Sequence, residues 1–566
     1  MSQKRDYSNW EPFFDFDNES PFLETPNRPW LKFRPSNVPK SIKFDPIPVN
    51  EFIKISVNRI PNNACVYHKP TDKKYTYREL LHVSGKVANA LHKIGINKGK
   101  AVGVMTSNCP EFLFSCLGIL ETGAAVTPIN PLLKDSDVIH IIQEAGIIDT
   151  VFVHKNNFRT MKKVLKKVEL KNVILIGAEE ARPNTITFEE FIKDSPSTPL
   201  NVNIDPMNDI AALLFTGGTT GLPKGVMLTH NNLVADALST LYMGGVSEEI
   251  EEDFGKTVNL SILPLCHTFG FEVMIIALVG GAMLVMFDSF NPTEVLEAIE
   301  FYKVKNFVGV PVMFQMLINC PDFYKRDLSS IEQANCGSAA LPTELARKWE
   351  EVTNVKIGQG FGLTEASPIT HMAVDWMPEI KSESIGIPII DTDAKIVDSD
   401  LNELPIGEVG ELLVRGPQIM KGYWKRPEET KRTIINGWLR TGDLARMDEQ
   451  GYFYIVGRTK DIIKYKGYKV MPKEVEDKLH EHPAVLEVGV VSAPDPSIGE
   501  TIKAYIVLKP EYKDKDITEK EIIEWSKERL AAYKYPRQIE FINALPRTSV
   551  GKIFRRKLRE RAKKES

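Results

Sequence analysis

The sequence predicts an α/β protein, with a large N-terminal domain of helix-covered, mainly parallel sheets, a small β-barrel-like subdomain, and a small hinged α+β domain at the C-terminal end. Three observations predict this. Up to about residue 320, apolar runs of strand length alternate with amphipathic helical stretches, which is typical of parallel sheets covered by helices. From 389 to about 455, short alternating strands and turns replace that pattern. After Gly457, about a hundred residues combine helices and strands again, enough for a separate domain.

The elements of the first domain follow from local signals along the chain. Thr76-Tyr77-Arg78-Glu79 is a capping-box pattern, and the apolar spacing after it predicts an amphipathic helix. The runs 100–105 and 124–128 predict strands on either side of a helix at 110–120. Further buried strands are predicted at 150–153, 172–176, 210–215 and 306–310.

The longest apolar stretch, 271–287, needs a separate interpretation. It has 17 residues, contains Glu272 and the pair Gly280-Gly281, and is shorter than the about 20 residues that a membrane-spanning helix needs. It is predicted to form a buried helix followed by a buried strand. No transmembrane segment is therefore expected.

The C-terminal part of the chain predicts smaller elements. Strands are predicted at 394–398 and 410–415, and Pro472 opens a helix that ends at His480. The last predicted elements are strands at 485–491, 502–508 and 538–542 and a helix near 518–530. The predicted domains are an N-terminal domain 1–456, with an irregular arm at about 1–48 and the barrel-like subdomain at about 389–456, a hinge 457–461, and a mobile C-terminal domain 462–566.

Composition excludes several classes of protein. A chain of 566 residues with 43% hydrophobic and 26% charged residues is a multidomain globular protein rather than a disordered or fibrous one. The net charge of -4 argues against a basic nucleic-acid-binding surface. Six cysteines without a CxxC pair or a metal-like spacing predict reduced thiols, and the N-terminus lacks the order of a signal peptide. A cytoplasmic location is expected.

The most informative motif is the loop Thr216-Gly217-Gly218-Thr219-Thr220-Gly221-Leu222-Pro223-Lys224, which follows the predicted strand 210–215. Glycines let backbone N–H groups approach an anion, threonine hydroxyls add donors, and Lys224 adds charge. A solvated linker has no need of a strand before it and a Pro-Lys-Gly stop after it. Because Pro223 precedes the lysine and no Ser or Thr follows it, the loop is not a Walker motif. It predicts ATP binding without predicting a P-loop NTPase.

Three polar islands follow this phosphate loop in the sequence. Asn335 to Pro342 is a small-residue loop that would let a flat ring lie against backbone, and 359–365 places a hydroxyl and a carboxylate beside a glycine turn. Thr441-Gly442-Asp443 offers a carboxylate to two vicinal hydroxyls, as in ribose recognition. Each island alone is weak evidence for a nucleotide site, since a Gly-Asp pair, for example, is common in simple turns.

In this order the motifs resemble those of the AMP-forming adenylate synthetases, which include acyl-CoA ligases, luciferases and the adenylation domains of peptide synthetases. The resemblance extends from about residue 50 to 560. Its five motifs are the phosphate loop, 360–365, 441–443, 457–474 and 546–552.

The resemblance implies a role for each motif residue toward ATP and Mg²⁺. Thr216 to Lys224 is expected to wrap the β- and γ-phosphates, and Lys552 to touch both the carboxylate and the α-phosphate. The residues expected around the adenine are Gly337, Ser338, Ala339, Gly360, Phe361 and Gly362. The other implied contacts are Thr364 to the α-phosphate, Glu365 and Thr219 to Mg²⁺, and Asp443 and Arg458 to the ribose.

The chemistry agrees with these roles. A carboxylic acid with a reference pKa of about 4 is ionised at neutral pH, so its attack on the α-phosphorus needs no general base. It needs charge neutralisation, which Mg²⁺, Lys552 and the phosphate loop would supply. A thiol then attacks the acyl-adenylate and AMP leaves.

The resemblance also implies that the C-terminal domain rotates between the two steps. Lys460 matches the hinge, Lys464 is expected to meet AMP in the second state, and Lys466 and Gly467 to line the entry of the thiol. A lysine-rich exposed hairpin is the alternative interpretation of 463–468.

The segment 263–270 matches the lining of the acyl pocket in fatty-acyl and coumarate ligases, with His267 at the pocket position, although a lone histidine beside a core strand is often structural. No aspartate stands there for a substrate ammonium, which disfavours amino acids. Gly362 stands where acetate ligases carry a tryptophan, so the pocket is expected to be open. The other expected lining residues are Val310 and Gly337, with Met313, Phe314 and Phe271 as further apolar candidates.

The predicted function is that of an ATP-dependent carboxylic acid:CoA ligase, acting first on medium- or long-chain fatty acids and thus in fatty acid metabolism. Coumarate-like aryl acids are the second choice and short hydroxy-acids the third. A chain ending at Ser566 without an appended carrier domain favours coenzyme A. The alternatives are an acyl-AMP ligase that loads a carrier protein, a luciferase-like oxygenase, and a nucleotide-binding regulator without turnover. The expected partners are ATP, CoA and a small acid, without nucleic acid, and a homodimer is left open.

Overall fold

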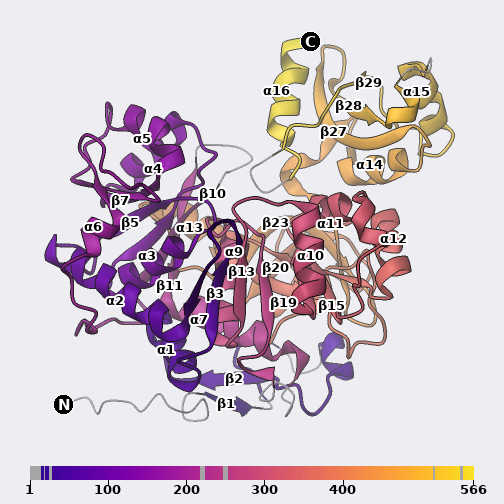
Figure 1. Cartoon of the computed structure of the whole chain (residues 1–566). Coiled ribbons are helices and arrows are strands. Elements are labelled where there is room, and N and C mark those ends of the chain that lie inside the picture. The colour runs from indigo at the N-terminus through magenta and orange to yellow at the C-terminus, as the bar shows by residue number, and fades with distance from the viewer. Residues whose placement is uncertain are drawn as a thin grey trace. The chain divides into compact units, whose positions relative to one another are not determined.

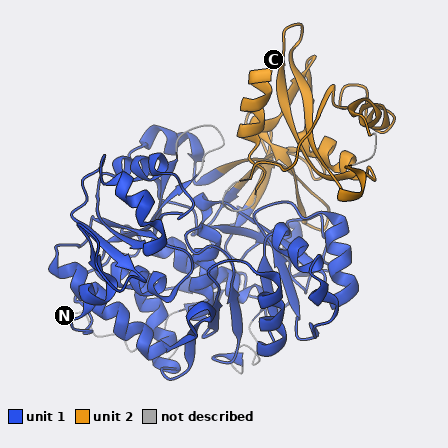
Figure 2. Cartoon of the chain, turned by 45° about the horizontal axis from the view of Figure 1, so that its top comes forward, with its two compact units in different colours: residues 1–217, 223–393, 414–439 blue, residues 218–222, 394–413, 440–566 orange. Residues whose placement is uncertain are grey.

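The computed structural model describes residues 14–17, 19–24, 28–216, 223–245, 253–513, 517–547 and 552–565. By their internal contacts they form two compact units (Figure 2). Unit 1 holds the described residues up to Thr216 together with 223–393 and 414–439. Unit 2 holds 394–413 and the described residues from Arg440 onward. The predicted domain boundary at 456 and the hinge at 457–461 remain predictions.

The largest sheet of unit 1 has eight strands and is mainly parallel, as predicted (Figure 1). In order across the sheet they are β21 (Gly422–Tyr423), β11 (Lys224–Thr229), β10 (Ile210–Thr216), β6 (Ala125–Pro128), β5 (Ala101–Met105), β7 (Ile148–His154), β8 (Asn172–Ile176) and β9 (Ile186–Thr187). Only the pairs β10–β11 and β11–β21 are antiparallel. The helices threaded between these strands are α2 (Tyr77–Lys93), α3 (Pro110–Glu121), α4 (Asp135–Ala145), α5 (Phe158–Val164) and α6 (Phe188–Ile192).

The capping box predicted at Thr76 is present at the start of α2. Thr76 Oγ1 accepts from Glu79 N at 3.2 Å, and Glu79 Oε2 accepts from Thr76 N at 2.7 Å. The helix then packs closely against α3, where a Cβ on Gly118 would lie 2.6 Å from Val87 Cγ1. A glycine is needed there because the two helices approach too closely for any side chain.

A four-stranded sheet follows the order β12 (Val258–Ser261), β13 (Met283–Met286), β3 (Ala64–His68) and β4 (Lys73–Thr76). The stretch 271–287 lies mostly in α9 (Thr268–Val279) and β13, so its interpretation as a buried helix and strand is confirmed. α9 packs on α1 (Val49–Arg59) and α7 (His230–Leu241). Across the described ranges, no helix has the length and apolarity to cross a membrane.

A five-stranded sheet carries the polar loops expected to bind the nucleotide. Its order is β14 (Asn306–Gly309), β15 (Gln333–Cys336), β16 (Ile357–Gly362), β17 (Ile369–Met372) and β18 (Ile387–Pro388), with the first three strands parallel. The helices along its chain are α10 (Pro292–Tyr302), α11 (Pro311–Ile318) and α12 (Thr343–Thr353).

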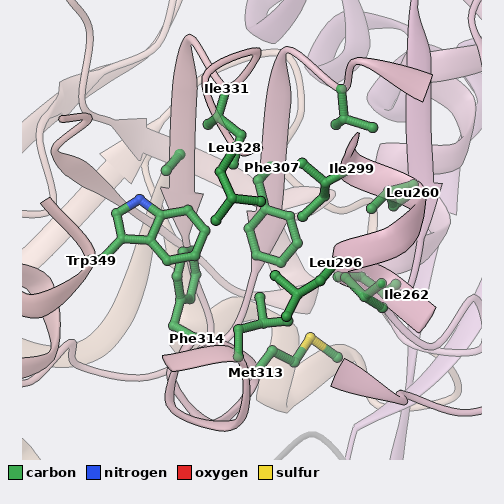
Figure 3. Close-up of a cluster of buried hydrophobic side chains, with 14 of the residues drawn as sticks. Leu260, Ile262, Leu296, Ile299, Phe307, Met313, Phe314, Leu328, Ile331 and Trp349 are labelled. Carbon is green, nitrogen blue, oxygen red and sulfur yellow. The ribbon is translucent and has the colours of Figure 1, made fainter. Parts of the chain in front are cut away.

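The apolar cluster of this sheet is drawn in Figure 3. The Phe314 ring lies 4.9 Å from the ring of Trp349 and 5.2 Å from that of Phe307, edge-on in both contacts. Met313 points into the same cluster. The side chains of Met313 and Phe314, considered for the acyl pocket, are thus accounted for by core packing, as is Phe271, whose buried ring meets Phe112 edge-on.

The N-terminal arm is more ordered than the sequence predicts. In its described part, β1 (Phe14–Asp17) pairs with β2 (Ser41–Phe44) in antiparallel register. Trp30 is 1% exposed, and Arg28 Nε lies 2.9 Å from the buried carboxylate of Asp393. A buried tryptophan and a buried ion pair anchor these residues to unit 1, and the bounds of the arm at about 1–48 stay a prediction.

The small sheet predicted after residue 389 has five strands. They are β19 (Asp393–Val397), β20 (Gly410–Arg415), β23 (Trp438–Met447) and β22 (Ile434–Ile435), with β24 (Phe453–Arg458) also paired to β23. Unit 2 also contains the hairpin β25 (Ile463–Tyr465) and β26 (Tyr468–Val470), the sheet β27 (Val485–Asp495), β28 (Gly499–Leu508) and β29 (Gln538–Phe541), and helices α14 (Pro472–His480), α15 (Glu519–Lys527) and α16 (Arg555–Glu565). This confirms the predicted α+β C-terminal part.

Candidate functional site

The phosphate loop connects two neighbouring antiparallel strands. Thr216, the last residue of β10, lies opposite Lys224, the first of β11. The sequence predicted that the loop leaves a strand, which is confirmed, but a strand follows it where many nucleotide loops lead into a helix. The expected phosphate contacts Gly217, Gly218, Thr219, Thr220 and Gly221 lie outside the described residues.

Lys224 is held by two side chains of a later segment. Its ammonium forms an ion pair with Glu429 of α13 (Pro427–Thr433) and lies 5.3 Å from the centre of the Tyr423 ring. The lysine side chain is 25% exposed, so the charge stays accessible from solvent.

The other expected nucleotide residues of unit 1 gather at one edge of the five-stranded sheet. The carboxyl ends of parallel strands meet at the same edge, and here they carry Val310, Gly337 and Gly360. Gly337 N donates to Gly309 O at 3.1 Å, and Gln359 Oε1 accepts from Leu341 N at 3.0 Å. The loop after β15 is therefore tied to the end of β14 and to β16.

Two glycines at this edge of the sheet approach neighbouring groups closely. A Cβ on Gly337 would lie 3.0 Å from the Phe269 ring, so the flat ring against this backbone is that of Phe269. A Cβ on Gly362 would lie 1.9 Å from Pro368 O. Backbone packing thus accounts for Gly362 whatever acid is bound. Ser338, between Gly337 and the exposed Ala339, has φ +69 and turns the chain.

Thr364 and Glu365 open a short 3-10 turn, Thr364–Ala366, which begins one residue after β16, the strand that contains Phe361. Thr268 Oγ1 donates to Thr364 Oγ1 at 3.1 Å, and Tyr423 Oη donates to Glu365 Oε1 at 2.8 Å. No described side chain hydrogen-bonds the second carboxylate oxygen of Glu365.

This free oxygen fits Mg²⁺, which takes oxygen ligands and is often bound by one carboxylate together with substrate phosphates. Among the described residues there is no group of three or more His, Cys, Asp or Glu side chains that could hold a metal ion. The free oxygen of Glu365 therefore fits a metal that is shared with a nucleotide.

His267 caps the N-terminus of α9. Its Nδ1 accepts from Phe269 N at 3.3 Å, which leaves Nε2 to carry the proton of the neutral ring. This cap accounts for a histidine at the position independently of any acid, and a role in the acyl pocket remains a prediction.

In unit 2, the expected ribose residues form a cross-strand ion pair. Arg458 on β24 lies opposite Asp443 on β23, with Arg458 Nε 2.8 Å from Asp443 Oδ1. Asp443 is 3% exposed, and its Oδ2 is buried without a hydrogen-bond partner among the described residues. Burial raises the pKa of Asp443, while the charges of Arg458 and Lys552 oppose that rise. A buried acceptor without a partner can accept a hydrogen bond from a hydroxyl group of a ligand.

The hairpin β25–β26 carries the residues expected near AMP and the thiol. Lys466 (φ +49) and Gly467 (φ +84) form its two-residue turn, and both are exposed, as is Lys464. This geometry matches the alternative interpretation, an exposed lysine-rich hairpin. It also leaves Lys464, Lys466 and Gly467 accessible to a ligand. The predicted hinge residue Lys460 is exposed, and its carbonyl accepts from Arg559 Nη1 at 3.3 Å.

The sequence patterns gave no indication of Tyr423, Glu429 or Asp236, and they marked Glu272 only as a charged residue in the apolar stretch 271–287. Tyr423 and Glu429 stand in a polar run, Gly422–Glu429, whose turn residues gave no sign of a partner. Asp236 and Glu272 stand inside apolar helical patterns, and such a polar interruption is the one signal that could have found them.

Asp236 of α7 and Glu272 of α9 are both fully buried. Asp236 Oδ2 accepts from Ile369 N at 3.4 Å, while Asp236 Oδ1 and both Glu272 oxygens have no partner within the described residues. Burial raises the pKa of both carboxyls, and the proximity of Asp236 raises the pKa of Glu272 further. The folded protein therefore holds protons here that the unfolded chain releases near pH 4 to 5.

The isosteric substitution Glu272→Gln is expected to stabilise the protein at alkaline pH. The pKa of Glu272 is higher in the folded protein than in the unfolded chain, so folding favours its protonated form. The stability that this gives the wild type is fully present below the pKa of the unfolded chain and is lost as pH rises through the folded-state pKa. The variant removes one titrating group and is expected to be more stable at pH 9 by about 1 to 3 kcal/mol, with little difference at pH 5.

Thermal melts of both proteins from pH 5 to pH 9 measure this difference. Glu350→Gln, at an exposed position of α12, is the matched control and is expected to leave the pH profile unchanged. Parallel profiles for wild type and Glu272→Gln would contradict the assignment of a raised pKa to this pair.

Comparison with known proteins identifies the family. A model described as "AMP-binding enzyme" matches residues 53–424, and one described as "AMP-binding enzyme C-terminal domain" matches residues 474–552. The chain belongs to the AMP-binding enzyme family.

Relatives of this AMP-binding enzyme match over almost its full length. The chain is 37% identical to a long-chain-fatty-acid–CoA ligase of Bacillus subtilis, covering 94% of this chain and 98% of the relative. It is 33% identical to a 4-coumarate-CoA ligase of Narcissus pseudonarcissus, covering 93% and 96%.

Solved structures give the same picture. The anthranilate CoA ligase AuaEII in complex with anthranoyl-AMP is similar with a TM-score of 0.82 at 30% identity, covering 92% of this chain and 98% of that one. ATP-bound MatB from Rhodopseudomonas palustris is similar with a TM-score of 0.81 at 25% identity, covering 91% and 99%. The α/β adenylate-forming fold is thereby confirmed.

Proposed function

We propose that this AMP-binding enzyme is an ATP-dependent carboxylic acid:CoA ligase that forms AMP and pyrophosphate, acting on medium- or long-chain fatty acids. The observation that carries the proposal is the full-length similarity to long-chain-fatty-acid–CoA ligases, which includes both family domains. The unpaired carboxylate oxygens of Glu365 and Asp443 support it, because each has the chemistry required for its expected ligand.

In the first step, the ionised carboxylate of the acid attacks the α-phosphorus of ATP and pyrophosphate leaves. Lys224 would bind the β- and γ-phosphates, and Asp443 Oδ2 would accept a hydrogen bond from a ribose hydroxyl. Lys552 would neutralise the negative charge on the oxygens of the carboxylate and the α-phosphate. Glu365 would hold Mg²⁺, which when bound offsets the negative charge of the phosphates.

In the second step, the thiol of CoA attacks the carbonyl carbon of the acyl-adenylate, a thioester forms and AMP leaves. We assign Lys464 to the AMP in this state, and Lys466 and Gly467 to the path of the thiol, because all three are exposed on one hairpin. The change of neighbours between the steps is assigned to rotation at Lys460.

Different observations favour different acid substrates. Fatty acids are the first choice because long-chain-fatty-acid–CoA ligases match this chain at up to 37% identity. Aryl acids are the second, since 4-coumarate–CoA ligases match at 33% identity and a solved anthranilate CoA ligase is similar in fold. The cap made by His267 and the packing at Gly362 are compatible with both.

A panel of acids tests the proposal. The purified chain with ATP, Mg²⁺ and CoA is expected to release AMP and form the thioester fastest with saturated fatty acids from octanoate to palmitate. Coumarate and 4-hydroxybutyrate are expected to react more slowly. Release of pyrophosphate without a CoA thioester, together with transfer to a holo-carrier protein, would overturn CoA as the acceptor.

The location and assembly are also proposed. A cytoplasmic location is supported by six free cysteines, five of them buried. A homodimer is tested by sedimentation of the purified protein.

A further inference from the structure

Tyr423 and Glu429 connect the phosphate-loop lysine to the carboxylate expected to hold Mg²⁺. Tyr423 Oη donates to Glu365 Oε1 at 2.8 Å, and the Tyr423 ring centre is 5.3 Å from Lys224 Nζ. The same ammonium pairs with Glu429 Oε1. Two residues six positions apart thus contact two groups that the sequence separates by 141 positions.

The segment that presents these two side chains is anchored at several points. β21 pairs with β11 so that Tyr423 lies opposite Val226, and Tyr423 N donates to Thr430 Oγ1 at 2.9 Å. Trp424 Nε1 donates to Ala145 O at 2.9 Å, and Arg426 Nη2 lies 2.6 Å from Glu144 Oε1. The backbone behind Tyr423 and Glu429 is therefore held against both β11 and the end of α4.

The energetics favour a functional reason for the ion pair. The side chains of Lys224 and Glu429 are 25% and 35% exposed, and a pair in such a position contributes little to stability. An ammonium has three donors, so Lys224 can keep Glu429 and still donate to a phosphate. Holding a flexible four-carbon side chain in one place lowers the entropy lost when the phosphate binds.

Tyr423 is suited to holding Glu365. The Tyr423 hydroxyl is a hydrogen-bond donor, and it donates to the Glu365 carboxylate at 2.8 Å. One carboxylate oxygen of Glu365 is thereby engaged and the other is left for a cation.

We propose that Glu429 and Tyr423 are positioning residues of the nucleotide site, with Glu429 orienting the Lys224 ammonium toward the phosphates of ATP and Tyr423 orienting the Glu365 carboxylate toward the metal. The inference rests on the proposed function, because it takes Lys224 and Glu365 as ATP and Mg²⁺ contacts. Neither Glu429 nor Tyr423 touches the reacting atoms.

The first test is Glu429→Gln, which keeps the shape of the side chain and removes its charge. Calorimetric binding of ATP is expected to weaken by about fivefold to tenfold, corresponding to about 1 kcal/mol. In steady-state kinetics the KM for ATP is expected to rise by the same factor while kcat changes less than twofold. In a Lys224→Met background, Glu429→Gln is expected to have no further effect on binding.

Glu428→Gln is the matched control, because Glu428 is the neighbouring residue and pairs with the exposed Lys431 at 3.0 Å. It is expected to bind ATP like the wild type. Unchanged ATP binding by Glu429→Gln overturns the inference, as does tighter binding, which would mean that Glu429 competes with the phosphates. An equal loss in the Lys224→Met background also overturns it. If the wild type itself does not bind ATP, the proposed function fails instead.

The second test is Tyr423→Phe, which removes the hydroxyl and keeps the ring beside Lys224. Binding of Mn²⁺ to the enzyme–ATP complex, followed by electron paramagnetic resonance, is expected to weaken by about threefold to tenfold. Metal-free binding of ATP is expected to stay unchanged. Unchanged Mn²⁺ binding overturns the role of Tyr423, and equal melting temperatures of variant and wild type show that folding is not the cause.

Discussion

Replacing Lys552 with alanine is expected to slow adenylate formation by about a hundredfold to a thousandfold, the loss typical of removing one donor from a developing charge. Lys552 lies close enough to Asp443 for its charge to oppose the rise in the pKa of that carboxyl. If Asp443 binds the ribose as proposed, a cation beside it would lie near the α-phosphate that Lys552 is proposed to neutralise. Pyrophosphate release with a good acid, measured without CoA, reports this step alone.

The control for this variant is Lys557→Ala, an exposed lysine of α16 in the same basic segment. It is expected to release pyrophosphate at the wild-type rate. Pyrophosphate release at the wild-type rate by Lys552→Ala would contradict the proposed mechanism and would favour the interpretation as a nucleotide-binding regulator. The acid substrate need not be the natural one, provided that the wild type turns it over.

Lys464→Ala is expected to slow thioester formation by about tenfold to a hundredfold and adenylate formation by less than twofold. Lys464 is exposed on β25, and its backbone N is fixed by Glu500 Oε2 at 3.0 Å, so the side chain is presented to solvent from a set position. Single-turnover experiments with preformed acyl-adenylate and CoA measure the second step separately from the first.

The structure offers a matched control for this variant across the hairpin. Lys469 lies directly opposite Lys464 in the register of β25 and β26, on the same face and likewise exposed. Lys469→Ala is expected to leave both steps unchanged. Lys460→Pro, which fixes φ at the proposed hinge, is expected to share the asymmetry of Lys464→Ala. Equal losses in the two steps would contradict the rotation of the C-terminal domain.

Much of the local structure could be predicted because its causes are local. The capping box at Thr76, the helix opened by Pro472 and the strand before the phosphate loop each depend on residues within one turn or one strand. The motif order likewise identified the family, since the motifs occur along the chain independently of packing. The anchoring of the N-terminal arm could not be predicted, because the partners of Trp30 and Arg28 come together only in the folded unit.

The sequence by itself determined the α/β class, the adenylate-forming family and the residue types suited to ATP, Mg²⁺ and CoA. Only the tertiary structure decided which side chains hold those residues in place. Tyr423 reaches Glu365 across 58 positions and Glu429 reaches Lys224 across 205, and the buried oxygens of Asp236 and Glu272 meet only where two helices pack. Periodicity reports which face of an element is buried, whereas the partner on that face depends on how the whole sheet closes.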